Sequence, residues 1–146
     1  MKMLSLLGKS LKNDEVIELL EAYDVDVIYA FDRLHENSPD VYWASINDLG
    51  LQLRFDESQR LDTIFCHVLP REGFGPILTE TIGVPIFDSY VLAEQACRRD
   101  GLQYKSSSSP GAWLKILTPG HDAHYQFKDG RLAMVTLMLS VSAQNA

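Results

Sequence analysis

The residues best able to do chemistry are two histidines and a carboxylate in the segment HDAH, residues 121–124. Two histidines with a carboxylate are a familiar ligand set for a transition metal, provided that the groups converge within coordination distance. His67 could join His121, Asp122 and His124 if its strand lies nearby. The competing interpretation is a polar hairpin, since HDAH follows a Pro-Gly turn. A small histidine-based metal-binding or hydrolytic domain is therefore an alternative hypothesis.

A nucleophilic mechanism finds little support in the sequence. Cys66 precedes His67, but neighbours on a strand point to opposite faces, so the two side chains cannot act as a nucleophile and its base. Cys66 and Cys97 have no CxxC spacing, which argues against a redox pair or a cysteine metal site. We therefore expect no catalytic residues, no cofactor and no bound metal, and a protein that is not an enzyme.

Composition limits the kinds of partner. The chain has 146 residues, of which 46% are hydrophobic, and 20 acidic against 13 basic residues give a net charge of -7. Such a surface repels phosphates, which argues against nucleic acid, and would suit a basic protein. No apolar run is long enough to span a membrane, and the first residues lack the pattern of a secretory signal. We expect a cytoplasmic protein with reduced cysteines.

Apolar periodicity predicts two helices and two sets of strands. The first helix follows the capping residue Asn13, and the second runs from a cap at Asp88 to a stop at Gly101. The alternating residues Val27, Tyr29 and Phe31 permit a further short strand without requiring one. The predicted strands are 41–46, 51–55, 60–69, 113–117, 124–127 and 131–141.

The chain also repeats itself at a spacing of 70 to 75 residues. The matching positions are Gly8 and Gly83, Asn13 and Asp88, Trp43 and Trp113, Phe55 and Phe127, and the pairs Arg60-Leu61 and Arg131-Leu132. The matching positions keep the same order while the spacing between them changes, which indicates an internal duplication. The predicted fold is α+β: a single domain, 1–146, of two tandem helix-plus-three-strand antiparallel units, about 6–68 and 82–141, joined by an irregular connection, 69–81.

One helix on three strands has too small a core to fold alone, so we expect both helices to cover the same face of the sheet. Alternation then places Leu51, Leu53 and Phe55 beneath the helices. Trp43 and Trp113 are also expected in the core. The opposite face is predicted to expose a patch of apolar and polar residues that binds a partner: Gln52, Arg54, Phe65, His67, His124, Gln126, Met134 and Met138.

The layout resembles the fold of the beta-lactamase inhibitor protein. The likeness lies in LGK or IGVP before a capped helix, a Trp-bearing strand, and F-x-x-x-x-R-L before the last apolar strand, across residues 6–140. In general character the chain is also similar to bacterial toxin-neutralising immunity proteins, including those paired with type VI secretion effectors. The resemblance implies a non-catalytic inhibitor whose uncovered sheet face binds a cognate toxin or effector.

Two further arrangements stay open at this point. A chaperone or adaptor of a secreted protein would have the same sequence features as an inhibitor. An edge strand such as 41–46 could also pair two copies of the chain into a homodimer.

Overall fold

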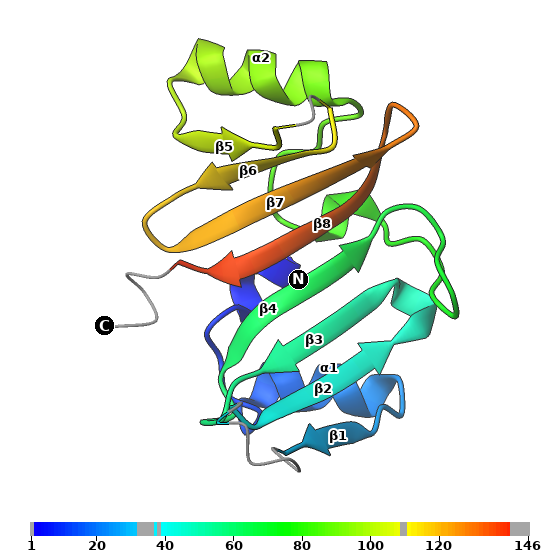
Figure 1. Ribbon diagram of the computed structural model, residues 1–146. Helices are drawn as coiled ribbons and strands as arrows, with labels where there is room; N and C mark the ends of the chain where they lie inside the picture. Colours follow the sequence, from blue (N-terminus) through cyan, green and yellow to red (C-terminus); the bar gives the residue numbers. More distant parts are fainter. Residues whose placement is uncertain (1, 32–36, 38, 109–110, 141–146) are drawn as a thin grey trace.

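The protein folds as an α+β structure built on one eight-stranded antiparallel sheet, which confirms the predicted fold class. The computed structural model describes residues 2–31, 37, 39–108 and 111–140 (Figure 1). The strand order is β1-β2-β3-β4-β8-β7-β6-β5. The helices are α1 (Asp14–Ala22) and α2 (Tyr90–Asp100), and three short 3-10 helices are η1 (Met3–Leu6), η2 (Asn47–Leu49) and η3 (Thr79–Thr81). The strands are β1 (Val27–Ala30), β2 (Val41–Ile46), β3 (Leu51–Phe55), β4 (Leu61–His67), β5 (Tyr104–Ser106), β6 (Trp113–Leu117), β7 (His121–Lys128) and β8 (Arg131–Leu139).

The predicted units of three strands are wrong, because each helix is followed by four. The first half runs α1-β1-β2-β3-β4 and the second α2-β5-β6-β7-β8, so the order of elements recurs. The added strands, β1 and β5, form the two outer edges of the sheet. β1 is the segment that alternation left ambiguous. β5 has only three residues, two of them exposed, so it carries no apolar pattern that sequence could detect. Strand 41–46, predicted as an edge, is flanked by β1 and β3.

The two halves join where β4 pairs with β8, in a register that sets Ile64 opposite Leu137 and Cys66 opposite Val135. All four side chains are buried. Each half also has a β-bulge. The register shifts leave Asp62 unpaired in β4 and Ala133 unpaired in β8, and these bulges lie 71 positions apart. A bulge turns the strand by one residue, which is why Leu61 and Ile64 both face the core.

The helix termini follow the predicted capping chemistry with one exception. The Asn13 side chain accepts a hydrogen bond from the backbone of Glu15 at the start of α1, and Gly101 ends α2 in the left-handed conformation. The second N-cap, however, is Ser89 and not Asp88. Ser89 is in extended backbone conformation and its hydroxyl accepts from the backbone N–H of Leu92.

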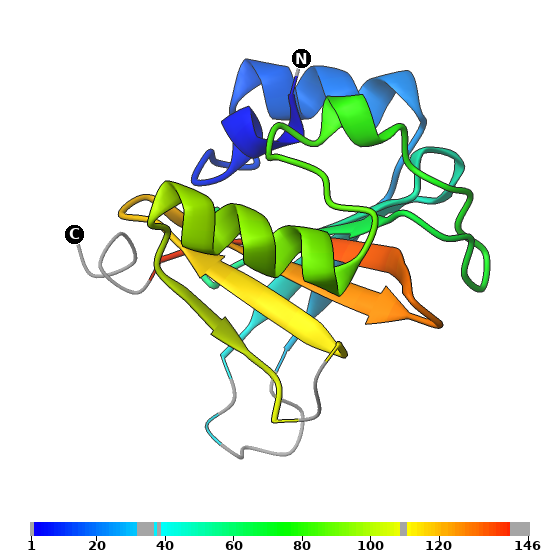
Figure 2. The same cartoon turned by 90° about the horizontal axis from the view of Figure 1, so that it is seen from above.

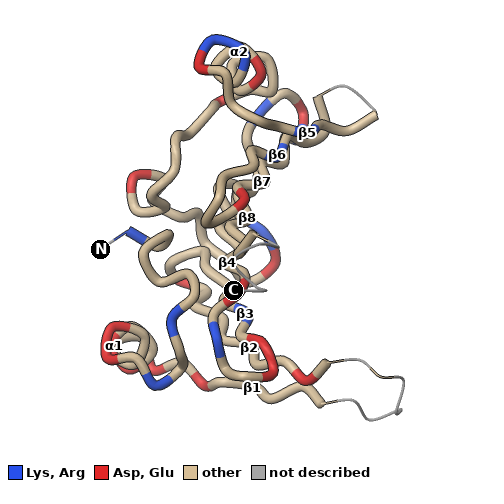
Figure 3. The backbone as a smooth tube through the Cα atoms, turned by 90° about the vertical axis from the view of Figure 1, so that its left-hand side faces the viewer, with Lys and Arg blue, Asp and Glu red and all other residues tan. Residues whose placement is uncertain are grey.

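Both helices lie on the same side of the sheet, together with η1 and the connection that precedes α2 (Figures 2 and 3). The core between these layers includes Leu6, Val16, Leu53, Phe55, Ile82, Ala93, Leu114, Tyr125 and Leu137, all with no exposed area. The Tyr125 hydroxyl donates to the carbonyl of Pro85 at 2.8 Å, which ties the connection to β7. Within the described part of the chain, neither helix is long and apolar enough to cross a membrane.

Gly50, in the turn before β3, lies very close to the backbone of the connection after β4. Its φ is +69°, and a Cβ there would lie 2.4 Å from the carbonyl oxygen of Gly75 and 2.8 Å from the backbone nitrogen of Ile77. Gly101 has a similar φ of +64° but nothing within 4 Å of the same position. Both glycines therefore adopt a left-handed backbone conformation, and they differ only in the room that is left for a Cβ atom.

We expect Gly101→Ala to lower the free energy of unfolding by about 1 to 2 kcal/mol, the usual cost of an alanine in the left-handed region. Gly50→Ala adds a clash with backbone atoms that cannot rotate away, so its loss should exceed about 3 kcal/mol. Urea unfolding of the two variants and the parent measures both values. Equal losses would contradict the close packing of Gly50 against residues 75–77.

Candidate functional site

The uncovered side of the sheet, called the open face below, consists of side chains that point away from both helices. Cross-strand partners share a face, and the register links Gln52 to Phe65, Phe65 to Thr136, and Thr136 to His124. The open face includes Ile28, Trp43, Ser45, Gln52, Arg54, Thr63, Phe65, His67, Lys105, Trp113, Lys115, Leu117, Asp122, His124, Gln126, Met134, Thr136 and Met138. The structure thus brings all eight predicted site residues onto one surface, and their role in binding stays a prediction.

The exposure expected for the apolar members of this set is wrong. Phe65, Met134 and Met138 are half-buried, and the ring of Trp43 on β2 stacks on Phe65. His67 is only 5% exposed. Its ring is covered by Phe74 of the connection after β4, with the ring centroids 4.5 Å apart. One end of the open face is therefore partly covered by the connection.

Two aromatic pairs lie on the open face, one in each half. Trp43 stacks on Phe65 with centroids 6.1 Å apart, and Trp113 stacks on His124 at 5.1 Å. Both tryptophans are half-buried, so the expectation that they fill the core is wrong. The signal was present in the sequence: a hairpin that turns at 47–50 sets Trp43 directly opposite Arg54, which alternation already assigned to this face.

Two basic side chains of the open face, Arg54 and Lys115, are paired with carboxylates. Arg54 contacts Asp62 at 2.7 Å, and the hydroxyl of Thr63 donates to the other oxygen of that carboxylate at 2.9 Å. Lys115 lies 3.7 Å from Asp122, a largely buried carboxylate. These contacts hold charged groups in place on the open face beside the aromatic pairs.

The proposed cluster of His67, His121, Asp122 and His124 does not form. His121 lies opposite Leu139 and, by alternation, shares the core side with Ala123, away from His124. His67 is on β4, two strands from His124 and in a different row of the register. Among the residues that the structure describes, no three metal-ligating side chains come together.

Cys66 is not poised for chemistry. Its side chain is fully buried, and burial raises the pKa of the thiol to about 12. A thiol in such surroundings is inert, because the thiolate is the reactive form.

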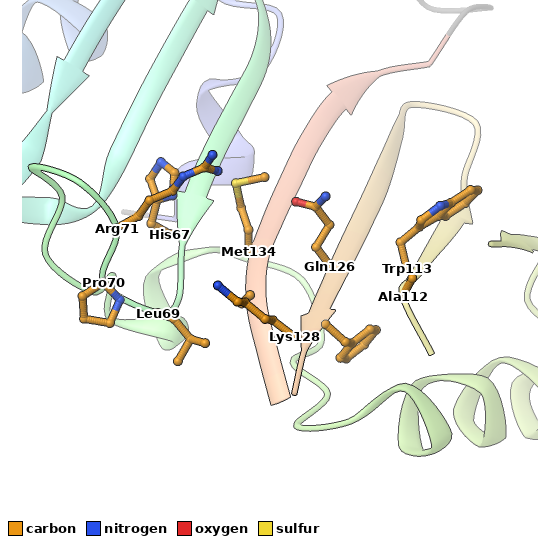
Figure 4. Close-up of a pocket in the computed structure, with 11 residues that line it drawn as sticks. His67, Leu69, Pro70, Arg71, Ala112, Trp113, Gln126, Lys128 and Met134 are labelled. Atoms are coloured by element: carbon orange, nitrogen blue, oxygen red, sulfur yellow. The ribbon is translucent and has the colours of Figure 1, made fainter. Parts of the chain in front are cut away.

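A hollow of about 520 Å³, called the cationic hollow below, lies at the end of the open face near the β7–β8 turn (Figure 4). Figure 4 shows His67 and Arg71 on one side of Met134, with Gln126 and Trp113 on the other. The residues that line the cationic hollow include no carboxylate; they are His67, Leu69, Pro70, Arg71, Ala112, Trp113, Gln126, Phe127, Lys128, Ala133 and Met134. An adjoining smaller hollow includes Phe74 and Glu72.

A second hollow of about 430 Å³, called the acidic hollow below, lies at the opposite end of the open face, near the β3–β4 turn. Its lining is Pro39, Asp40, Val41, Arg54, Asp56, Glu57, Ser58 and Asp62. The two ends of the same surface therefore carry opposite charge. Sequence reasoning missed this polarity, because Arg71 and Lys128 come from a loop and a strand end whose meeting only the fold determines.

Comparisons of the chain with models of known protein families, with curated protein sequences and with solved structures found no match. What the protein does must therefore be inferred from its own surface.

The three histidines of the described chain share one electrostatic property. Burial lowers the pKa of His67, His121 and His124; Arg71 adds to the effect at His67 and Lys115 at His124, while Asp122 opposes it at His121. All three are consequently neutral in the folded protein at neutral pH.

We expect the protein to lose stability as the pH falls from 7.5 to 5.5. Below the usual histidine pKa near 6.5 the unfolded chain binds protons that the folded chain does not, so acid favours unfolding until the lowered folded pKa is reached. Urea unfolding at several pH values measures the slope. His67→Gln should reduce it, whereas Gln126→Asn, a non-titrating change nearby, should not. An unchanged slope in His67→Gln would contradict the buried neutral state of His67.

Proposed function

We propose that this chain is a non-catalytic binding protein that captures another protein on its open face. The observation that supports this proposal is the one-sided cover of the sheet. The helices cover one face, while the other, apart from the end where Phe74 covers His67, presents Trp43 with Phe65, Trp113 with His124, and two methionines. Aromatic residues and methionine are enriched at the centres of protein interfaces, where a few anchors supply most of the binding energy.

The shape of the open face favours a protein over a small ligand. The aromatic pairs lie in different halves, on β2 and β4 in the first and on β6 and β7 in the second, with β8 between them. A stable interface covers on the order of 800 Å² on each partner, which a broad sheet face can provide and a small molecule cannot fill. The ion pair of Arg54 with Asp62 supplies fixed polar groups beside the Trp43–Phe65 anchor pair, and interfaces combine apolar anchors with such polar groups.

The most specific form of the proposal is an immunity protein that binds and neutralises a cognate toxin or effector. Support comes from the sequence resemblance and from the net charge of -7, which would attract a basic partner. The acidic hollow, with Asp56, Glu57 and Asp62, would receive a basic side chain of such a partner. Among the residues that the structure describes, the histidines form no ligand cluster that would favour the metal-dependent alternative.

The test is co-expression of this chain with the product of the adjacent gene, scored by co-purification and by survival of the cells. The double variant Phe65→Asp, Met138→Asp places charge among the anchors and should abolish capture and protection. The matched control is Val91→Asp, which adds charge on α2, where Val91 is 60% exposed. An aspartate in the first turn suits the helix dipole, so this control should fold and bind normally.

Phe65→Ala removes the ring without adding charge, and should weaken the complex by about 2 kcal/mol or more if the ring is an anchor. Circular dichroism melts establish that each variant is folded. Full capture by the folded double variant would exclude the open face as the binding surface. Capture of a partner that is not toxic would support an adaptor or chaperone instead of an immunity protein.

A further inference from the structure

The acidic and cationic hollows occupy equivalent places in the two halves. Arg54 and Asp56 in the first correspond to Gln126 and Lys128 in the second, 72 positions later. The bulge residue Asp62 corresponds to Ala133, 71 positions later. Each hollow therefore lies beside a bulge, next to the turn that joins the last two strands of its half. The backbone plan is shared, and only the side chains differ.

The side-chain differences remove a carboxylate from the second hollow. In the first half, Asp62 projects from the bulge and pairs with Arg54 at 2.7 Å. In the second half, Ala133 has no side chain beyond Cβ, and Gln126 stands in place of Arg54. Lys128 replaces Asp56, and Arg71 lies across the hollow on the connection. Neither Lys128 nor Arg71 forms an ion pair with any residue that the structure describes.

His67 supplies an independent sign that the cationic hollow is incomplete. Its Nε2 atom is buried and has no hydrogen-bond partner among the described residues, although the ring lines the hollow. A buried polar nitrogen without a partner costs free energy, so such atoms are rare unless something else satisfies them. A neutral imidazole protonated at Nε2 would donate a hydrogen bond to an oxygen placed in the hollow.

We propose that the cationic hollow binds a side-chain carboxylate, from a Glu or Asp next to an apolar residue, of the protein captured on the open face. This inference rests on the proposed function. Lys128, Arg71 and His67 would surround the carboxylate, while Trp113 and Met134 would pack on its apolar neighbour. Charge complementarity favours a carboxylate in the cationic hollow, because the carboxylate would lie at the place that the Asp62 side chain occupies in the first half. The net charge of -7 disfavours a polyanion such as nucleic acid.

The partner would then meet a polarised surface: an acidic group at the cationic end and a basic group at the acidic end. Such an arrangement fixes the orientation of the partner, because the reversed pose brings like charges together. The two hollows thereby break the symmetry that the repeated halves would otherwise give the open face.

The experiment is a nuclear magnetic resonance titration of the full chain with the capped peptide acetyl-Phe-Glu-Ala-amide, and with its Gln counterpart as the matched probe. The Glu peptide should shift the signals of the Trp113 indole N–H and the backbone amides of Gln126, Lys128 and Met134, saturably. The Gln peptide should bind about tenfold more weakly, since it lacks the charge-assisted hydrogen bonds.

Three variants sharpen the test. Ala133→Asp restores the carboxylate that the first half has at Asp62, and should abolish binding of the Glu peptide by occupying the hollow. Arg71→Gln should weaken binding about tenfold without altering the bulge. Lys105→Gln, which removes an exposed cation of β5 outside the lining, should leave binding unchanged. Thermal melts show which variants are folded, and Arg71→Gln decides the outcome if Ala133→Asp is not.

Equal binding of the Glu and Gln peptides, or shifts located away from the hollow, would overturn the proposal. Tighter binding of inorganic phosphate than of the Glu peptide would overturn it in favour of a phosphate ligand. The titration needs no partner protein, so its failure is distinct from failure of partner capture. The double variant Phe65→Asp, Met138→Asp separates the two proposals. If this variant still captures the partner and still binds the Glu peptide, the result would support the cationic hollow and reject the open face as the capture surface.

Discussion

The pairing of β4 with β8 is the contact on which the rest of the structure depends. These strands end their respective halves, and their antiparallel register, with Ile64 opposite Leu137 and Cys66 opposite Val135, turns two four-stranded sheets into one. Neither half has enough apolar surface to form a core with a single short helix. Joined along β4 and β8, they share the buried layer beneath α1, α2 and η1. One continuous core follows, and with it one continuous uncovered face.

The same joint determines what the uncovered face can do. Because the halves meet antiparallel, equivalent positions lie at opposite ends of the sheet, so Trp43 and Trp113 lie apart and the two turn-side hollows lie at opposite ends. Equivalent backbones carry different side chains at the bulges, Asp62 in one half and Ala133 in the other. Repetition of the halves would make this surface symmetric, but the different side chains give its two ends opposite charge. For a binding protein, such polarity supports orientation of the partner as well as attraction.

The proposed function uses the surface of this fold and not an internal chemical site. Cys66 is buried with a raised pKa, and the histidines that could coordinate a metal are divided between strands and faces. The groups that do converge are aromatic rings, methionines, amides and cations, which recognise other molecules by contact, hydrogen bonding and charge. Capture of a protein on the open face and insertion of its carboxylate into the cationic hollow would use these properties alone.

The sequence by itself determined what depends on neighbouring residues: the capped helices at Asn13 and Gly101, the alternation that separates Leu53 from Gln52, and the spacing that relates the halves. Local patterns suffice there because helix periodicity, strand alternation and turns are local physics. Only the tertiary structure decided the eight-stranded order, the edge strand β5, the cover of Phe74 over His67, and the meeting of Arg71 with Lys128. Each of these joins residues far apart in the chain, and such contacts depend on packing between elements, which no short stretch of sequence encodes.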